Sequence, residues 1–256
     1  MSNPPPSTSI QLPSRGALYG HAEGEPAIPE GRVSLRKWTV QELSFLESQG
    51  ENVLDRVRRI IDTCVTLPNG FPPEKLLIVD RFAILLAQRV FSVNTPALVY
   101  DYRCTFCGQV NYKVRGDIVA DFNEKVAADD LVEPLEVKLP DAGKTVSLRF
   151  LRGFDEEAVA KVAKRMRMAS NDGSDPSSLL RIGRQIVSVD GATMNEKEKD
   201  FFVKSLVVSD LLCIRRVLDA AEPGIDTTFH PTCKHCGAES EVEMQFSAEF
   251  FRPTVV

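Results

Sequence analysis

The sequence predicts an α+β protein, with an N-terminal helical part and a C-terminal α/β part joined by a split zinc ribbon. Three observations lead to this prediction. Apolar residues recur at helical spacing between residues 39 and 91. After residue 95, short runs alternate between apolar and polar side chains and are separated by glycine, proline and aspartate. Two CxxCG motifs, CTFCG at 104–108 and CKHCG at 233–237, each adjoin such a run.

The chain is predicted to divide where its composition changes. A segment rich in proline and glycine precedes the first capped helix, and the two CxxCG motifs enclose a long stretch of helix and strand patterns. Loop-closure entropy grows only with the logarithm of loop length, so a long insertion between two halves of one metal site is permitted. The predicted parts are an extended arm (1–31), a helical part (32–99), the split ribbon (100–112 with 228–247), an α/β part (113–227) and a C-terminal tail (248–256).

The arm has few bulky apolar side chains, so it is not expected to bury enough surface to offset the entropy of ordering it. The stretch LPSRGALYG at 12–20 is the exception. Leu12, Arg15 and Tyr19 within it are our candidate partner contacts. The anchors could also dock on the chain's own domain, and the composition alone fits an unstructured tail equally well.

Three predicted helices dominate the helical part. TVQE at 39–42 is a capping box that predicts a helix start. The apolar residues of 51–65 fall on one helical face. Residues 74–91 predict a long apolar helix, in which Asp80 and Arg81 are the charged interruptions. Charges on so apolar a helix are expected to be paired or to lie at an edge.

The α/β part begins with a predicted strand pair at 135–151. Asp155 is expected to cap the next helix, and residues 182–190 predict a strand. Asn195, with a glutamate three residues later, predicts a second capped helix. Ser209 is expected to cap a third helix, which ends at a Pro-Gly pair.

The two CxxCG motifs together predict a structural Zn²⁺ site. Zinc prefers four thiolate or imidazole ligands in a tetrahedron, and two intervening residues let a tight turn present both sulfurs to one ion. Glycine after the second cysteine permits the positive φ that this turn requires. A site with four protein ligands leaves no open position for substrate, which favours a structural role over metal catalysis. The predicted ligands are Cys104, Cys107, Cys233 and Cys236.

Other interpretations of the cysteines stay open at this point. The four thiols could be buried without metal, or a CxxC could be a redox pair, although neither motif begins a helix in a βαβ pattern. His230 or His235 could replace one cysteine as a ligand. Iron is an alternative to zinc.

Composition and motifs argue against several function classes. The formal charge of −5 disfavours strong nucleic-acid binding, which depends on Lys and Arg contacts to phosphate. No apolar run reaches the length of a membrane span, and residues 1–10 lack the features of a secretory signal, so we expect a reducing compartment. P-loop, GxGxxG, GxSxG and HExxH motifs are missing, and histidines number only 3. We therefore expect no enzymatic activity.

The tail contains FFRP at 250–253. Aromatic and arginine residues are enriched at interface hot spots, so Phe250, Phe251 and Arg252 are further candidate partner contacts. The alternative is that the two phenylalanines cover the core.

The ordered motifs resemble those of the T4-type phage baseplate hub assembly chaperones. The resemblance spans nearly the whole chain and rests on LPSRG..YG, IIDTCV, LLIVDRFAILLAQRVFS, C..CG, DLLCIRRVLDAAEPGID and FFRP. It implies a virion-assembly protein that works in the host bacterial cytoplasm and binds baseplate, hub or tail-tube subunits. Retention in the finished particle is not implied by it.

A zinc-ribbon nucleic-acid or transcription adaptor is the alternative function. Ribbons often present basic and aromatic residues beside the knuckles. Such residues are present here, but three glutamates follow the second knuckle and offset them. A gel shift at moderate salt separates the two hypotheses, because clear binding favours the nucleic-acid adaptor.

Overall fold

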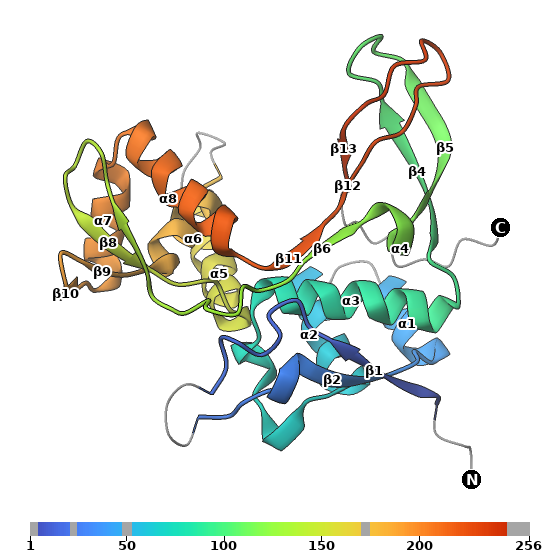
Figure 1. Ribbon diagram of the computed structural model, residues 1–256, viewed down its shortest axis with the longest axis horizontal. Helices are drawn as coiled ribbons and strands as arrows, with labels where there is room; N and C mark the ends of the chain where they lie inside the picture. Colours follow the sequence, from blue (N-terminus) through green and yellow to red (C-terminus); the bar gives the residue numbers. More distant parts are fainter. Residues whose placement is uncertain (1–4, 21–24, 48–52, 170–174, 245–256) are drawn as a thin grey trace.

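The computed structural model describes residues 5–20, 25–47, 53–169 and 175–244. These residues form an N-terminal lobe, a C-terminal lobe and an arm of two hairpins that projects away from both lobes (Figure 1). The mixture of helices and small antiparallel sheets confirms the α+β prediction. No helix among these residues is both long and apolar enough to span a bilayer.

The N-terminal lobe combines three helices with a small sheet of order β1-β2-β3. The helical part therefore also contains strands. Thr39 caps the first helix as predicted: its N–H donates to the Glu42 carboxylate at 2.7 Å, and its hydroxyl accepts from the Gln41 N–H at 3.3 Å. The elements are β1 (Ser7–Gln11), β2 (Arg32–Arg36), α1 (Val40–Glu47), α2 (Val53–Cys64), β3 (Val65–Thr66) and α3 (Ile78–Val93), with 3-10 turns at Pro29–Gly31, Pro68–Gly70 and Pro73–Lys75.

The segment predicted as an arm is folded onto this lobe over its described part. β1 pairs with β2 in antiparallel register, with Ser7 opposite Arg36. Leu12, Leu18 and Ile28 are buried in the main core cluster. The prediction of a separate extended arm is corrected in this respect. The large apolar residues Leu12, Leu18, Tyr19 and Ile28 of its described part occupy core positions, so their burial offsets the ordering entropy despite the proline-rich composition.

A buried carboxylate on α3 holds this segment in place. Asp80 accepts a hydrogen bond from the Ser14 N–H at 3.1 Å and from the Tyr19 hydroxyl at 2.5 Å. The Tyr19 hydroxyl in turn accepts from the Leu77 N–H at 2.9 Å. The Asp80 side chain is fully buried, and this burial raises the pKa of Asp80 above its ordinary value, although Ser14 and Tyr19 oppose the shift. Asp80 is thus paired, as expected, with hydrogen-bond donors of the N-terminal segment.

The C-terminal lobe packs helices against a four-stranded antiparallel sheet of order β10-β9-β8-β7. Val146 of the central strand lies opposite Val137 on one side and Val189 on the other. The elements are β7 (Leu135–Lys138), β8 (Thr145–Leu148), α5 (Gly153–Ala169), α6 (Ser177–Gln185), β9 (Ile186–Val189), β10 (Ala192–Thr193), α7 (Glu196–Ser205) and α8 (Val208–Ala221). The predicted strand pair at 135–151 is therefore confirmed.

Some local predictions for this lobe were right and others wrong. The capping box of Asn195 and Glu198 forms at the start of α7. The strand predicted for 182–190 is confined to β9, because the preceding residues form α6. Asp155 lies inside the first turn of α5, where it accepts from the Arg152 N–H at 3.0 Å and pairs with Arg149. Ser209 likewise lies inside α8, whose N-cap is the residue before Val208.

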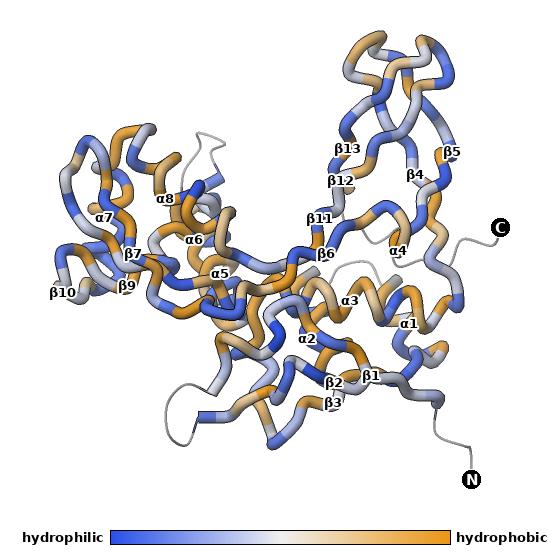
Figure 2. The backbone as a smooth tube through the Cα atoms, viewed as in Figure 1, coloured by the Kyte–Doolittle hydropathy of each residue, from blue (hydrophilic) through white to orange (hydrophobic). Residues whose placement is uncertain are grey.

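The two lobes contact each other directly. The Ile78 N–H donates to the Leu151 carbonyl and the Gly153 N–H donates to the Leu76 carbonyl, both at 3.0 Å. One core cluster contains Leu12 of the N-terminal lobe as well as residues of the C-terminal lobe. Figure 2 shows α3 as a largely hydrophobic segment next to this junction. The junction is therefore a shared apolar core, and the hairpin arm does not lie between the lobes (Figure 1).

Removal of the Asp80 carboxylate should destabilise the protein. Asp80→Ala leaves the Ser14 N–H and the Tyr19 hydroxyl without their buried acceptor, which is expected to cost about 3 kcal/mol of unfolding free energy. Urea denaturation followed by far-UV circular dichroism measures this loss.

Asp62→Ala is the matched control, since Asp62 is half-exposed and forms only a surface pair with Arg58 at 3.7 Å. Its effect should stay below about 1 kcal/mol. Equal destabilisation by the two substitutions would show that Asp80 does not anchor the segment.

Candidate metal centre

The projecting hairpin arm, which is distinct from the N-terminal segment 1–31, consists of two hairpins whose tips carry the CxxCG motifs. The first is formed by β4 (Ala97–Arg103) and β5 (Val110–Asp117), and the second by β12 (Thr228–Phe229) and β13 (Val242–Glu243). The base of this hairpin arm adjoins α4 (Ile118–Asp121) and a short antiparallel strand pair formed by β6 (Asn123–Lys125) and β11 (Gly224–Asp226). The two hairpins of the arm therefore come from two distant segments of the sequence, as predicted.

Both tips have the same backbone geometry. In the first, the Cys104 N–H donates to the Gln109 carbonyl at 2.9 Å and the Gly108 N–H donates to the Cys104 carbonyl at 3.0 Å. In the second, the equivalent bonds of Cys233 and Gly237 measure 2.8 and 3.0 Å. The φ angles of Gly108 and Gly237 are 71° and 73°, a region that favours glycine. The glycine after each second cysteine is therefore required by the turn, as the sequence predicted.

The four cysteine sulfurs converge on one point. All lie within 4.8 Å of one another, with Cys104 Sγ 3.8 Å from Cys236 Sγ and Cys107 Sγ 3.7 Å from Cys233 Sγ. Ligands about 2.3 Å from a central ion lie about 3.8 Å apart in a tetrahedron. A disulfide needs a sulfur separation of about 2.05 Å, and all four cysteines are free. The arrangement fits a four-thiolate metal site.

The centre does not include a histidine. Within the described residues, the cluster that could hold a metal ion contains only the four cysteines. His235 contributes its backbone N–H, which donates to Cys233 Sγ at 3.4 Å, while its side chain is exposed. His230 is also exposed and lies beside three glutamates in an open groove of the arm. The geometry therefore favours cysteine over histidine as the fourth ligand.

Two polar residues that the sequence analysis missed contact the sulfurs. Asn111 Nδ2 donates to Cys233 Sγ at 3.4 Å, and its Oδ1 accepts from the Lys234 N–H at 2.9 Å. Ser240 Oγ lies 3.5 Å from Cys104 Sγ. Both residues are buried. The one sequence signal for Asn111 is a polar side chain at an inward position of the strand that follows the first motif.

Hydrogen bonding and mutual proximity shift the pKa values of Cys104 and Cys236 in opposite directions. The backbone N–H of Cys107, helped by Ser240, lowers the pKa of Cys104 to about 6. The backbone N–H of Ala238 lowers the pKa of Cys236, but the three neighbouring sulfurs, with some desolvation, outweigh it and raise this pKa to about 12. Thiols this close are not expected to ionise together at neutral pH unless a cation compensates their charge.

Only a small apolar core supports the tip of the arm. Tyr102, Cys104 and Cys233 are its buried members, and the Tyr102 hydroxyl donates to the Pro231 carbonyl at 3.4 Å. So small a core gives limited stability by itself. A shared ion would add a strong connection between the two hairpins.

The three candidate partner contacts that the structure describes lie apart from this centre. Leu12 and Tyr19 are 0% and 7% exposed, so their assignment as partner contacts is corrected in favour of the alternative, docking on the chain's own domain. Arg15 is partly exposed and pairs with Glu124 at 3.9 Å. The remaining three candidates, Phe250, Phe251 and Arg252, lie outside the described residues.

Comparison with known proteins gives one match. The family model described as T4 bacteriophage base plate protein matches residues 21–252, which include all four cysteines of the arm, the C-terminal lobe and the N-terminal lobe apart from β1 and the segment that follows it. No curated protein and no solved structure matches the chain. Because the matched region covers nearly the whole sequence, the chain belongs to the T4 bacteriophage base plate protein family.

Proposed function

We propose that this baseplate protein is a non-enzymatic chaperone and adaptor that binds hub or tail-tube initiation subunits, and that its cysteine centre holds a structural Zn²⁺. The observation that carries the metal assignment is the set of four free sulfurs within 4.8 Å of one another. The adaptor role is supported by the family and by the surface of the arm. The protein would act in the host bacterial cytoplasm while the baseplate forms, holding subunits until the correct neighbour displaces it.

The metal would have a mechanical role in the arm. Cys104, Cys107, Cys233 and Cys236 would supply four thiolates, and the bound zinc would supply a cross-link between hairpins that are far apart in sequence. Asn111 and Ser240 would orient and stabilise the two buried sulfurs. With four protein ligands the site is closed, so it supports a fixed shape of the arm.

Exposed aromatic residues on the arm support a binding role. Phe106, inside the first knuckle, is 71% exposed, and Tyr112 on β5 is 66% exposed. Large aromatic side chains on a projecting surface are typical of interface anchors. An arm stiffened by zinc would present them with little loss of conformational entropy on binding.

Zinc content tests the metal assignment. Protein purified without chelators should contain about one zinc per chain by plasma mass spectrometry. Cys107→Ser and Cys236→Ser change the two exposed ligands and should lose most of the metal and lower the Tm of the arm.

Cys213→Ser is the matched control, because Cys213 lies on α8 outside the cluster. It should retain the wild-type zinc content. Iron in place of zinc, or no metal in freshly isolated wild-type protein, would contradict the assignment.

Complementation of a phage that lacks this gene tests the adaptor role. The double variant Phe106→Ala, Tyr112→Ala should bind zinc normally but reduce plaque formation by about tenfold or more, because an interface anchor typically contributes at least 1–2 kcal/mol. Mass spectrometry of the purified complexes should show loss of the hub or tube-initiation subunits that co-purify with the wild type.

Phe201→Ala serves as the control, since Phe201 is equally exposed at 77% but lies on α7 of the C-terminal lobe. Normal plaque counts and unchanged co-purification for the arm variant would contradict the arm as the binding surface.

A further inference from the structure

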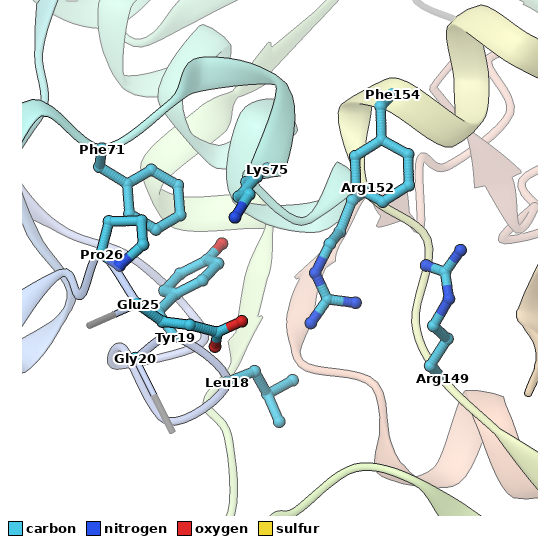
Figure 3. A pocket seen from close by; sticks show the side chains of 10 residues that line it. All are labelled: Leu18, Tyr19, Gly20, Glu25, Pro26, Phe71, Lys75, Arg149, Arg152 and Phe154. Carbon is cyan, nitrogen blue, oxygen red and sulfur yellow. The ribbon is translucent and has the colours of Figure 1, made fainter. Parts of the chain in front are cut away.

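A second candidate site lies at the junction of the lobes, away from the cysteine centre. A cavity of about 300 Å³ opens between the segment after β1, the 3-10 turn Pro73–Lys75 and the start of α5 (Figure 3). Its walls come from both lobes, so the site exists only when the lobes are packed together. The lining residues are Leu18, Tyr19, Gly20, Glu25, Pro26, Phe71, Lys75, Arg149, Arg152 and Phe154.

The cavity is lined by three cations and one carboxylate. Figure 3 shows the Lys75 amino group and the Arg152 guanidinium directed toward the same space, with Arg149 beyond them. Figure 3 shows the carboxylate of the exposed Glu25 directed toward the same space, although among the described residues it forms no ion pair with these cations. Lys75 is exposed, and no ion pair within the described part of the chain neutralises it. Of the described cations in the lining, Lys75 is therefore the one without an ion pair, while Arg149 and Arg152 are paired with carboxylates that lie outside the lining.

Each of the two arginines is held in position by a carboxylate that lies outside the cavity lining. Arg149 forms a bidentate pair with the buried Asp155, with both N–O distances 2.7 Å. Arg152 donates to Glu133 at 2.6 Å. Neither carboxylate lines the cavity. A guanidinium has five N–H donors, so each arginine keeps donors for a ligand while its position is already fixed.

Apolar surfaces surround these charges. The Tyr19 ring packs edge-on against Phe71 with centroids 5.0 Å apart, and its hydroxyl is already bonded to Asp80. The Arg149 guanidinium lies 5.5 Å from the centre of the Phe154 ring, which is 40% exposed. An anion in such a cavity is partly shielded from water, so its attraction to the cations is stronger than on an open surface.

We propose that this cavity binds one acidic side chain, with a neighbouring aromatic residue, from an extended segment of a partner baseplate protein. The volume accommodates side chains but not a helix or a nucleic-acid strand, and the net charge of −5 opposes binding of a polyanion. The carboxylate occupies the space between Lys75 and Arg152, and the aromatic ring packs on Phe154, the exposed aromatic residue of the lining. This inference rests on the proposed adaptor function.

NMR titration of the full-length protein with a capped Phe-Glu-Phe peptide tests the cavity. We expect saturable shifts of the Arg149 and Arg152 side-chain N–H resonances, and no comparable shifts with Phe-Gln-Phe. Lys75→Ala should weaken binding about three- to tenfold, since one charge contact is lost. Glu25→Gln should strengthen binding about twofold, because a competing carboxylate at the rim loses its charge.

Lys164→Ala is the matched control, an exposed lysine on α5 outside the cavity, and should leave the affinity unchanged. Three results would overturn the proposal: no shifts with the acidic peptide, equal binding of the neutral peptide, or the same shifts with inorganic phosphate at the same concentration. The titration uses purified components. Absence of peptide binding, together with reduced plaque formation by the Phe106→Ala, Tyr112→Ala variant, therefore overturns the cavity alone. Peptide binding together with normal plaque counts and unchanged co-purification for that variant overturns the arm as the binding surface.

Discussion

Burial of α3 on nearly all sides is the constraint on which the rest of the structure depends. A helix that is apolar around its circumference must be covered by other elements over most of its surface. Ile84 on α3 belongs to the core cluster shared by the two lobes, whereas Leu85 and Leu86 belong to a second cluster at the base of the arm. The helix therefore determines where the N-terminal segment, the C-terminal lobe and the arm can lie.

The polar groups on α3 make this packing specific. Asp80 accepts hydrogen bonds from the N-terminal segment, and the buried Arg89 donates to the Ala97 carbonyl at 2.9 Å, where β4 of the arm begins. A buried charge without its partner is strongly unfavourable, so only one position of each neighbouring segment satisfies these groups. Apolar burial supplies the stabilisation, and Asp80 and Arg89 select the arrangement.

This arrangement separates two surfaces with different chemistry. The arm carries exposed aromatic residues on hairpins that a zinc ion would stiffen, whereas the junction of the lobes forms a cationic cavity with aromatic walls. Both are positioned by α3 but share no residues. An assembly protein with two such surfaces could contact two different subunits and set their relative position, which is the physical content of an adaptor role.

The sequence by itself determined the features that depend on neighbouring residues. The CxxCG turns, the capping boxes at Thr39 and Asn195 and the apolar faces of the helices follow from short-range geometry and periodicity. The candidate ligand set was predictable for the same reason, since two residues between cysteines determine how a turn presents sulfur.

Tertiary structure alone decided which segments contact one another. The docking of the N-terminal segment on Asp80 joins residues 61 and 66 positions apart, and the Asn111 contact to Cys233 spans 122 positions. Lys75, Arg149 and Arg152 lie around one cavity only because the lobes share a core. Such contacts depend on the burial of distant side chains against each other. The secondary-structure propensities of short segments do not reveal this burial. The free energy of burial is gained only after segments that are far apart in the sequence have come into contact.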